Sequence, residues 1–224
     1  MPELPEVETI RRELSRRVAG SVFASAEVRV AKMANLKSTV LSRALRGRRV
    51  EAVLRRAKML VLRLSGHRFL AFHLKMTGQL VYAPPHGRRV SGGHPIPNLG
   101  VLPNQFTHVI FRFRDGGTLY LNDQRKFGWV RFVDLDGLHR LTAHLGAEPL
   151  SAAFTAQYFR RVARRYPNRA IKSVLMDNAL LVGVGAWIAT APARTFALPV
   201  WAARPAVLGG GMAGLGFLAA VALG

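Results

Sequence analysis

The sequence predicts an α+β protein in which an N-terminal helix is followed by an antiparallel β sandwich or barrel, and then by a smaller helical domain. Short apolar runs separated by turn residues occupy most of residues 21–133, whereas from residue 137 the apolar residues recur with helical spacing. Strands first and helices afterwards are typical of two packed domains. We therefore predict a β domain over residues 1–135 and a partial helical domain over residues 136–185 of the 224-residue chain.

The first expected element is a helix over residues 2–19. Prolines and glutamates open this segment, and Arg11, Arg12, Arg16 and Arg17 follow them. Acidic residues near the start of a helix and basic residues near its end interact favourably with the helix dipole. Proline is tolerated in the first turn because the N–H group that it lacks would have no helical partner there.

Seven strands are expected next, over residues 21–30, 48–54, 59–64, 68–74, 107–114, 118–121 and 129–133. Val109, Phe111 and Phe113 alternate with largely basic positions, which predicts a strand with one apolar face and one basic face. The following Asp115-Gly116-Gly117 predicts a hairpin turn. The Pro- and Gly-rich residues 82–105 predict a mobile surface loop.

Helices are expected over residues 138–145, 152–166 and 169–181. The apolar residues placed near one face of the last helix are Ile171, Val174, Leu175 and Val182. The Gly183-Val184-Gly185 turn then ends this helix.

The composition changes after Gly185. Residues 186–224 are rich in Ala, Gly and Pro and contain no acidic residue, so they form an atypical tail. Residues 206–224 are uncharged and long enough for a membrane span, but their glycines weaken a helix and no basic flank follows them. We favour an unstructured or misread tail over an inserted span.

The charge points to a polyanionic partner. The chain has 33 Lys and Arg against 12 Asp and Glu, a formal net charge of +21. Nucleic acid is the favoured partner, with an anionic membrane surface or another acidic partner as the alternative. The absence of cysteine excludes disulfides and cysteine-ligated zinc, and fits a reducing compartment. No apolar segment of a secretory signal opens the chain, so a cytoplasmic protein is expected.

Pro2 is a candidate nucleophile. If Met1 is removed, Pro2 becomes a secondary amine beside Glu3 and Glu6. An α-amino group has a pKa of about 8, against about 10.4 for lysine, so a useful fraction is unprotonated near neutrality. Amines of this kind form Schiff bases with electrophilic carbons. The alternative interpretation is that Pro-Glu merely begins a helix.

Three further segments carry candidate residues. Lys58 stands at the head of an apolar strand, where alone it would be a solvated strand end. Residues 73–78 form a turn that exposes His73 and Met76, although an isolated methionine is more often core packing. Residues 122–128 form a polar loop in which an aromatic lies beside two cations, and such a loop suits insertion into a base step.

Taken together, these segments resemble the formamidopyrimidine-DNA glycosylase family. The resemblance rests on Met1-Pro2-Glu3-Leu4-Pro5-Glu6-Val7-Glu8-Thr9, Lys58, residues 73–78, residues 123–128, and residues 175–178 through the Gly183-Val184-Gly185 turn. Their order and spacing match the family over residues 1–185. Leu4 with Val7-Glu8-Thr9 is more similar to the branch that acts on oxidised purines than to the endonuclease VIII branch.

The resemblance implies a bifunctional glycosylase and abasic-site lyase of base-excision repair. It would flip 8-oxoguanine or a formamidopyrimidine out of double-stranded DNA. Pro2 would attack C1′ of the deoxyribose and form a Schiff base, and Glu3 would move protons on the sugar ring. Lys58 would contact the adjoining phosphate and assist proton transfer. Successive β and δ eliminations would then cut the strand.

The resemblance also implies DNA-binding residues. Met76, Arg125 and Phe127 would fill the void left by the extruded nucleotide, with Arg125 facing the orphaned cytosine. His73 lies in the same exposed turn as Met76, and Lys172 matches a basic position at the start of a helix-two-turn-helix module. The implied protein is a monomer associated with the nucleoid, and no membrane partner is expected.

The match to the family fails beyond Gly185. Where the family has Asn-Ile-Tyr-Ala, this chain has Ala186-Trp187-Ile188-Ala189, so the residue that caps the next helix is missing. Most members also end in a four-cysteine zinc finger, and without cysteine no zinc is expected here. A shifted reading frame would explain the change, a hypothesis that reading the other frames beyond codon 185 tests.

Two alternative functions follow from these departures. The first is a catalytically impaired homologue that still binds DNA through its basic residues, since each lost phosphate contact weakens binding. The second is a membrane-tethered DNA-binding protein that uses residues 206–224.

Overall fold

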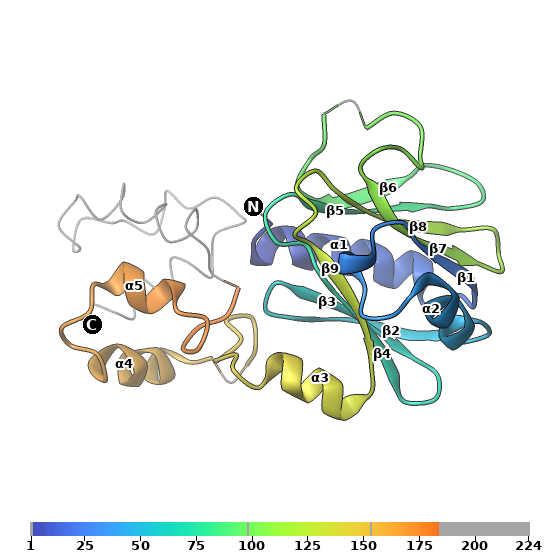
Figure 1. Cartoon of the computed structure of the whole chain (residues 1–224). Helices are drawn as coiled ribbons and strands as arrows, with labels where there is room; N and C mark the ends of the chain where they lie inside the picture. The colour runs from blue at the N-terminus through green and yellow to red at the C-terminus, as the bar shows by residue number, and fades with distance from the viewer. Residues whose placement is uncertain (1, 98, 153, 184–224) are drawn as a thin grey trace. The chain divides into compact units, whose positions relative to one another are not determined.

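The computed structural model describes residues 2–97, 99–152 and 154–183 (Figure 1). Its chain divides into two compact units, one ending at Ala143 and the other beginning at His144. No helix within the described residues is long and apolar enough to cross a membrane. The expectations for residues 186–189, for the tail and for a span over 206–224 fall outside the described residues.

Helix α1 (Leu4–Val18) confirms the helix expected over residues 2–19. The Glu3 N–H group donates to the Glu6 carboxylate at 3.0 Å, which fixes the first turn. The buried face of α1 comprises Leu4, Val7, Ile10, Leu14 and Val18. This spacing of three and four residues produces one apolar stripe.

Two antiparallel sheets follow α1 and confirm the predicted fold class (Figure 1). The five-stranded sheet has the order β1 (Phe23–Val28), β7 (Thr107–Phe113), β8 (Thr118–Asp123), β5 (Gly78–Ala83), β6 (Val90–Gly93). The four-stranded sheet has the order β2 (Val50–Arg56), β3 (Met59–Leu64), β4 (Arg68–His73), β9 (Trp129–Val133). Each of the seven expected runs corresponds to one of these strands.

The main core lies where the two sheets face one another. Phe72 of β4 and Phe111 of β7 meet edge to face, with ring centroids 5.6 Å apart. Phe111 and its neighbours Val109 and Phe113 are buried, as the alternation predicts. Ile110, on the opposite face, is also buried, so that face is less basic than expected.

Helix α1 contacts β2 of one sheet and β6 of the other. A Cβ atom at Gly92 of β6 would lie 2.3 Å from the Cβ atom of Ile10. Only glycine permits this close approach of helix and strand.

Four regular elements were not expected from the sequence: the short 3₁₀ helix η1 (Ala31–Met33), α2 (Ser38–Leu45), β5 and β6. Helix α2 has no side-chain cap at Lys37, so it lacks the usual start signal. Strand β6 pairs with β5 within residues expected to form only a loop, and its two glycines conceal it. The prediction of a single loop over 82–105 is therefore wrong for residues 90–93.

Helix α3 (Leu135–Thr142) belongs to the first unit. The Asp134 carboxylate caps it by accepting from the Gly137 N–H group at 2.8 Å. Leu138 and Leu141 pack against buried residues of β3 and β4. The division of the chain therefore falls after Ala143, whereas the sequence interpretation started the helical domain at residue 136.

The second unit contains α4 (Ala156–Arg164) and α5 (Ile171–Met176). The Thr155 hydroxyl caps α4 by accepting from the Tyr158 N–H group at 3.1 Å. The buried residues Phe154, Phe159, Leu175 and Leu181 form the small core of this unit.

Helix α5 is shorter than the predicted helix over 169–181. Asp177 is extended, and its carboxylate accepts from the Ala179 N–H group at 3.0 Å, which forms a turn. Ile171 is 44% exposed and does not share the buried position of Val174 and Leu175, contrary to the expected face.

Candidate functional site

The N-terminal residues and Lys58 lie in one neighbourhood of the first unit. Pro2 is buried, and Glu3 is only 3% exposed. Lys58 lies in the turn between β2 and β3 and is half-buried. Burial lowers the pKa of the Lys58 ammonium, and the nearby carboxylates of Glu3 and Glu6 oppose this by raising it. The neutral amine is therefore more accessible than in a solvated lysine.

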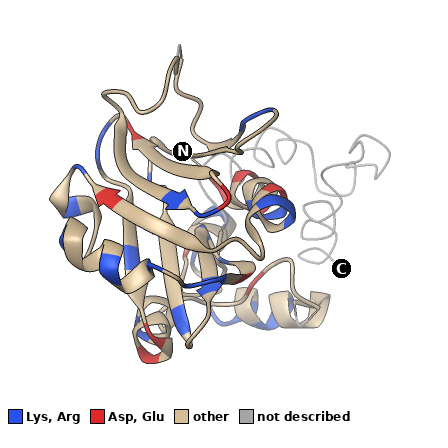
Figure 2. Cartoon of the chain, turned by 90° about the vertical axis from the view of Figure 1, so that its right-hand side faces the viewer, with Lys and Arg blue, Asp and Glu red and all other residues tan. Residues whose placement is uncertain are grey.

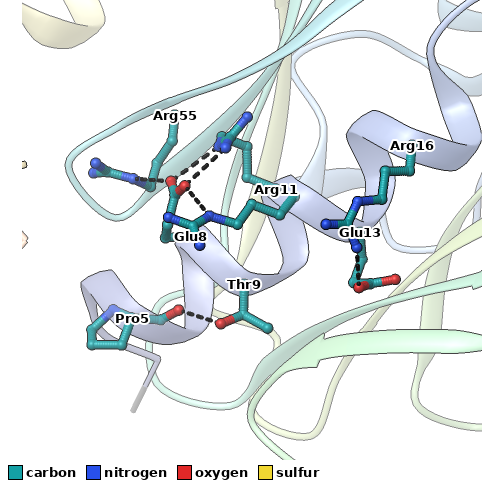
Figure 3. Close-up of polar contacts among 8 residues, drawn as sticks. Pro5, Glu8, Thr9, Arg11, Glu13, Arg16 and Arg55 are labelled. Atoms are coloured by element: carbon teal, nitrogen blue, oxygen red, sulfur yellow. Dashed lines mark hydrogen bonds and ion pairs between the residues drawn. The ribbon is translucent and has the colours of Figure 1, made fainter. Parts of the chain in front are cut away.

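An arginine joins α1 to the turn that holds Lys58 (Figure 3). The Arg55 Nε atom donates to the Glu8 carboxylate at 3.0 Å, and Nη1 donates to the carbonyl oxygen of Ala57 at 2.8 Å. The Arg55 side chain is only 6% exposed. Ala57 has φ 55°, a left-handed conformation that is unfavourable for a residue with a Cβ atom. The bond from Arg55 therefore holds the turn in a conformation it would not favour alone.

The Glu8 carboxylate has an unusually low pKa. Its burial would raise the pKa, but hydrogen bonds from Arg11, Arg12 and Arg55 outweigh this and lower it to about 2. Figure 3 shows the guanidinium groups of Arg11 and Arg55 converging on the carboxylate. Nε of Arg12 also donates to it at 2.9 Å. Glu8 is thus ionised at any pH at which the protein would work.

His73 ends β4 directly across from Met59, the residue after Lys58. Burial lowers the pKa of the imidazole to about 4, and the positive charges of Lys75 and Lys58 add to this effect. The Lys75 N–H group donates to Nδ1 of His73 at 3.0 Å. The neutral ring consequently carries its proton on Nε2, where it can donate a hydrogen bond.

Met76, Arg125 and Phe127 form an exposed group. Met76 is 41% exposed and Phe127 49% exposed, which is unusual for large apolar side chains. The guanidinium carbon of Arg125 lies 4.8 Å from the centroid of the Phe127 ring, a cation–π contact. The buried carboxylate of Asp123 bonds to both loops that carry these residues.

Lys172 lies in the second unit, in the first turn of α5, and is exposed. Exposed arginines accompany it on and beside α4, namely Arg160, Arg161, Arg164 and Arg165. Figure 2 shows basic residues on helices and strands alike. The structure thus groups Pro2, Glu3, Lys58 and His73 within the first unit, and Lys172 belongs to a separate set of cations.

Sequence reasoning missed the supporting roles of Arg55 and Thr77. Arg55 and Glu8 are 47 positions apart, and Thr77 and Asp123 are 46 apart. No local pattern marks such pairs, because each residue taken alone resembles an ordinary strand or turn residue.

A family model confirms what the fold and these residues indicate. The model described as the formamidopyrimidine-DNA glycosylase N-terminal domain matches residues 1–130. The chain belongs to the formamidopyrimidine-DNA glycosylase family.

Curated relatives and solved structures agree with this membership. The formamidopyrimidine-DNA glycosylase of Chloroflexus aurantiacus is 38% identical over 188 residues, covering 83% of this chain and 62% of the relative. That of Geobacter sulfurreducens is 41% identical over 187 residues, covering 83% and 63%. The chain spans about 62% to 64% of the length of the curated relatives it matches.

Among solved structures, the complex between Lactococcus lactis Fpg and an abasic site containing DNA is similar with a TM-score of 0.68 and 28% identity. The match covers 84% of this chain and 65% of the Lactococcus lactis chain. MutM in complex with carbocyclic 8-oxo-G containing DNA gives a TM-score of 0.68 at 29% identity, with 84% and 65% covered.

The residues of this chain do not fit a four-cysteine zinc finger, because the sequence contains no cysteine. Within the described residues, no group of three or more His, Asp and Glu side chains could hold a metal ion. We therefore assign no step to a metal.

Proposed function

We propose that this chain is a DNA glycosylase and abasic-site lyase that removes oxidised purines from double-stranded DNA through the amine of Pro2. The observation that carries the proposal is the grouping of Pro2, buried Glu3 and half-buried Lys58 in a member of this family. Such an enzyme would act as a monomer in the cytoplasm, at the nucleoid.

The chemistry begins once Met1 is removed. The Pro2 nitrogen forms a bond to C1′ of the lesion nucleotide, the bond from C1′ to the base breaks, and the base leaves with the electron pair. Opening of the sugar ring gives a Schiff base. Glu3, a buried carboxyl directly after Pro2, supplies a proton to the ring oxygen.

The β and δ eliminations that follow need a group that accepts a proton from the sugar and a cation that contacts the departing phosphate. Removal of a C2′ proton expels the 3′ phosphate, and a second elimination expels the 5′ phosphate. Lys58 lies beside the reacting end of the chain and carries either a positive charge for a phosphate or, as its lowered pKa permits, a neutral amine for proton transfer.

The exposed side chains of Met76, Arg125 and Phe127 explain how the enzyme could reach the lesion nucleotide. C1′ cannot be reached inside the base stack, so the nucleotide must leave the duplex. Met76 and Phe127 are exposed apolar side chains able to occupy the void, and Arg125 provides donors for the orphaned base. Neutral His73 offers a further donor to the DNA backbone.

Borohydride trapping tests the proposal. The full chain, with Met1 removed, is incubated with a duplex that contains 8-oxoguanine opposite cytosine, and borohydride reduces any Schiff base to a stable adduct. We expect an adduct that is lost in Pro2→Gly and retained in Pro5→Ala, a matched change at the exposed proline in the first turn of α1. An adduct that survives Pro2→Gly and is mapped by peptide mass spectrometry to a lysine would exclude Pro2 as the nucleophile.

The second candidate is a DNA-binding protein that does not turn over. The observation that favours it is the loss of the family pattern directly after Gly185, where this chain has Ala186-Trp187-Ile188-Ala189, combined with a net charge of +21. Fluorescence anisotropy with the same duplex separates the two: tight, salt-dependent binding without any adduct would support this candidate.

A further inference from the structure

We propose that Asp123 is a positioning residue that holds residues 74–77 and 124–128, here called the wedge loops, as one preformed unit. The inference rests on the proposed function, because it assumes that the wedge loops enter the DNA. The inference goes beyond the proposed function because it names what sets the geometry of the wedge loops. That residue is Asp123, which is fully buried and therefore out of reach of DNA.

Asp123 organises its own loop through three backbone N–H groups. Its Oδ1 atom accepts from Arg125 at 3.0 Å, and its Oδ2 atom accepts from Phe127 at 2.9 Å and from Gly128 at 2.6 Å. The Asp123 side chain is completely buried. The backbone of the loop is therefore turned inward toward the carboxylate, while the side chains of Arg125 and Phe127 are exposed.

Thr77 connects the second loop to the same carboxylate. Its hydroxyl donates to Oδ1 of Asp123, and the Arg125 N–H group approaches the same hydroxyl oxygen at 3.2 Å. Thr77 follows Met76 in sequence, and Gly78 pairs with Asp123 where β5 and β8 meet. The position of Met76 is thereby coupled to the positions of Arg125 and Phe127.

The backbone of Asp123 is also held by contacts outside the wedge loops. Nε2 of buried His108 lies 2.7 Å from the carbonyl oxygen of Asp123. At Gly128, a Cβ atom would lie 3.0 Å from Oδ2 of Asp123 and 3.3 Å from the carbonyl oxygen of His73. There is little room for the carboxylate to move.

The loop also contains a conformation that needs support. Lys126 has φ 58°, which a residue with a Cβ atom seldom adopts. The bonds on either side of it, to Arg125 and Phe127, hold this conformation before any DNA arrives. A preformed loop loses less conformational entropy on binding, so Asp123 contributes to lesion binding without touching DNA.

The test uses Thr77→Val, which removes the hydroxyl at nearly constant volume, and Asp123→Asn, which replaces one acceptor by a donor and removes the negative charge that the three N–H groups share. Thr39→Val, on the exposed side of α2, is the matched control. Circular dichroism establishes that each full-length variant is folded. Thr77→Val leaves the bonds of Asp123 to its own loop in place, so it remains informative if Asp123→Asn unfolds.

The first measurement is amide hydrogen exchange at residues 125–128 in the protein alone. We expect exchange at Phe127 and Gly128 to accelerate about ten-fold or more in Asp123→Asn, because their acceptor is disturbed. At Arg125 we expect a smaller acceleration in Thr77→Val, because this N–H group loses the Thr77 hydroxyl and keeps its bond to Asp123. The control should match the wild type. Unchanged exchange in both variants would overturn the inference.

The second measurement is binding to a duplex that contains a tetrahydrofuran abasic-site analogue beside 2-aminopurine, whose fluorescence rises when it is unstacked. We expect Thr77→Val to weaken binding about five-fold, and to add nothing in the background of Phe127→Ala, because Thr77 acts through the loop that carries Phe127. Additive losses would show a general structural role and overturn the inference. If the wild type does not bind this duplex, the proposed function itself fails, and the inference with it.

Discussion

The two units of this chain hold their charged residues in different ways. In the first unit, candidate residues depend on buried partners: Arg55 joins Glu8 to the Lys58 turn, and Asp123 joins two loops. In the second unit, Arg160 and Lys172 are exposed on short helices that cover a four-residue core. The difference fits the proposed roles, in which bond-breaking chemistry needs the fixed geometry of the first unit and phosphate binding needs the exposed charge of the second.

Substituting the buried carboxylate of the first unit should give the largest effect. We expect Glu3→Gln to reduce the rate of base excision by roughly 10²–10⁴-fold, since it removes a proton donor and keeps the shape of the side chain. Single-turnover kinetics on an 8-oxoguanine duplex measure this. DNA affinity should change little. An equal fall in affinity and rate would indicate that Glu3 serves binding rather than chemistry.

The small core of the second unit offers the next test. Phe159→Ala should cost about 3 to 5 kcal/mol of stability, because the ring is fully buried and few residues surround it. We expect only the second unit to unfold, so that trypsin cleaves within residues 160–172 while the first unit persists. Gln157→Ala, exposed on the same helix, is the control. Simultaneous unfolding of both units would mean that they are not independent.

Removing the hydrogen-bonded link between α1 and the Lys58 turn should give the third-largest effect. Arg55→Met should cost about 3 kcal/mol, because it leaves a partly buried carboxylate with one donor fewer. It should also slow borohydride trapping by freeing the turn. Arg12→Met removes another guanidinium from Glu8, but that side chain is 64% exposed, so we expect a loss of only about 0 to 1 kcal/mol. Chemical denaturation compares the two, and equal losses would contradict the assigned role of Arg55.

Acid should weaken the first unit through Glu8. Its pKa in the folded protein is about 2, below the ordinary value of 4.5, so its stabilising contribution is present above pH 4.5 and is lost as the pH falls toward 2. The full shift would correspond to about 3.4 kcal/mol, and solvent screening of this partly exposed carboxylate reduces the contribution to about 1 to 2 kcal/mol. Urea denaturation between pH 3 and 6 should show a steeper fall for the wild type than for Glu8→Gln. Parallel curves would contradict the low pKa.

The smallest effect is expected in the second unit. Lys172→Ala should weaken binding to any duplex a few-fold and reduce the salt slope by about 1, as the loss of one phosphate contact predicts. Titrations at several salt concentrations measure the slope. The rate of chemistry with saturating DNA should remain unchanged, and a slower rate would place Lys172 closer to the reaction than we propose.

Much of the fold could be predicted from the sequence. The bounds of β3 and β9 agree with the expected runs, and the Asp115-Gly116-Gly117 turn joins β7 to β8 as expected. Local periodicity and turn residues are enough for such elements. Strand β5 was missed because it follows directly after residues 73–78, which were interpreted as a functional turn. Strand β6 was missed because half of its residues are glycine.

The candidate site was predictable to a smaller extent. Pro2, Lys58 and Phe127 lie in recognisable motifs, and in the structure Glu3, the residue after Pro2, is close enough to Lys58 for its charge to raise the Lys58 pKa. Arg55 and Thr77 could not be found in this way, because their roles arise only when segments distant in sequence pack together. Their importance depends on tertiary contacts, which a single sequence does not encode in any local pattern.

The hydrogen bond from the Glu3 N–H group to Glu6 determines which partner must move in the proposed reaction. It ties the residue beside Pro2 to the first turn of α1, which restricts how far the amine could move toward a target. In the proposed reaction the sugar would therefore travel to the amine. Enzyme turnover would then be limited by how readily a damaged nucleotide leaves its stack, and the DNA duplex, rather than the protein terminus, would supply the mobile component.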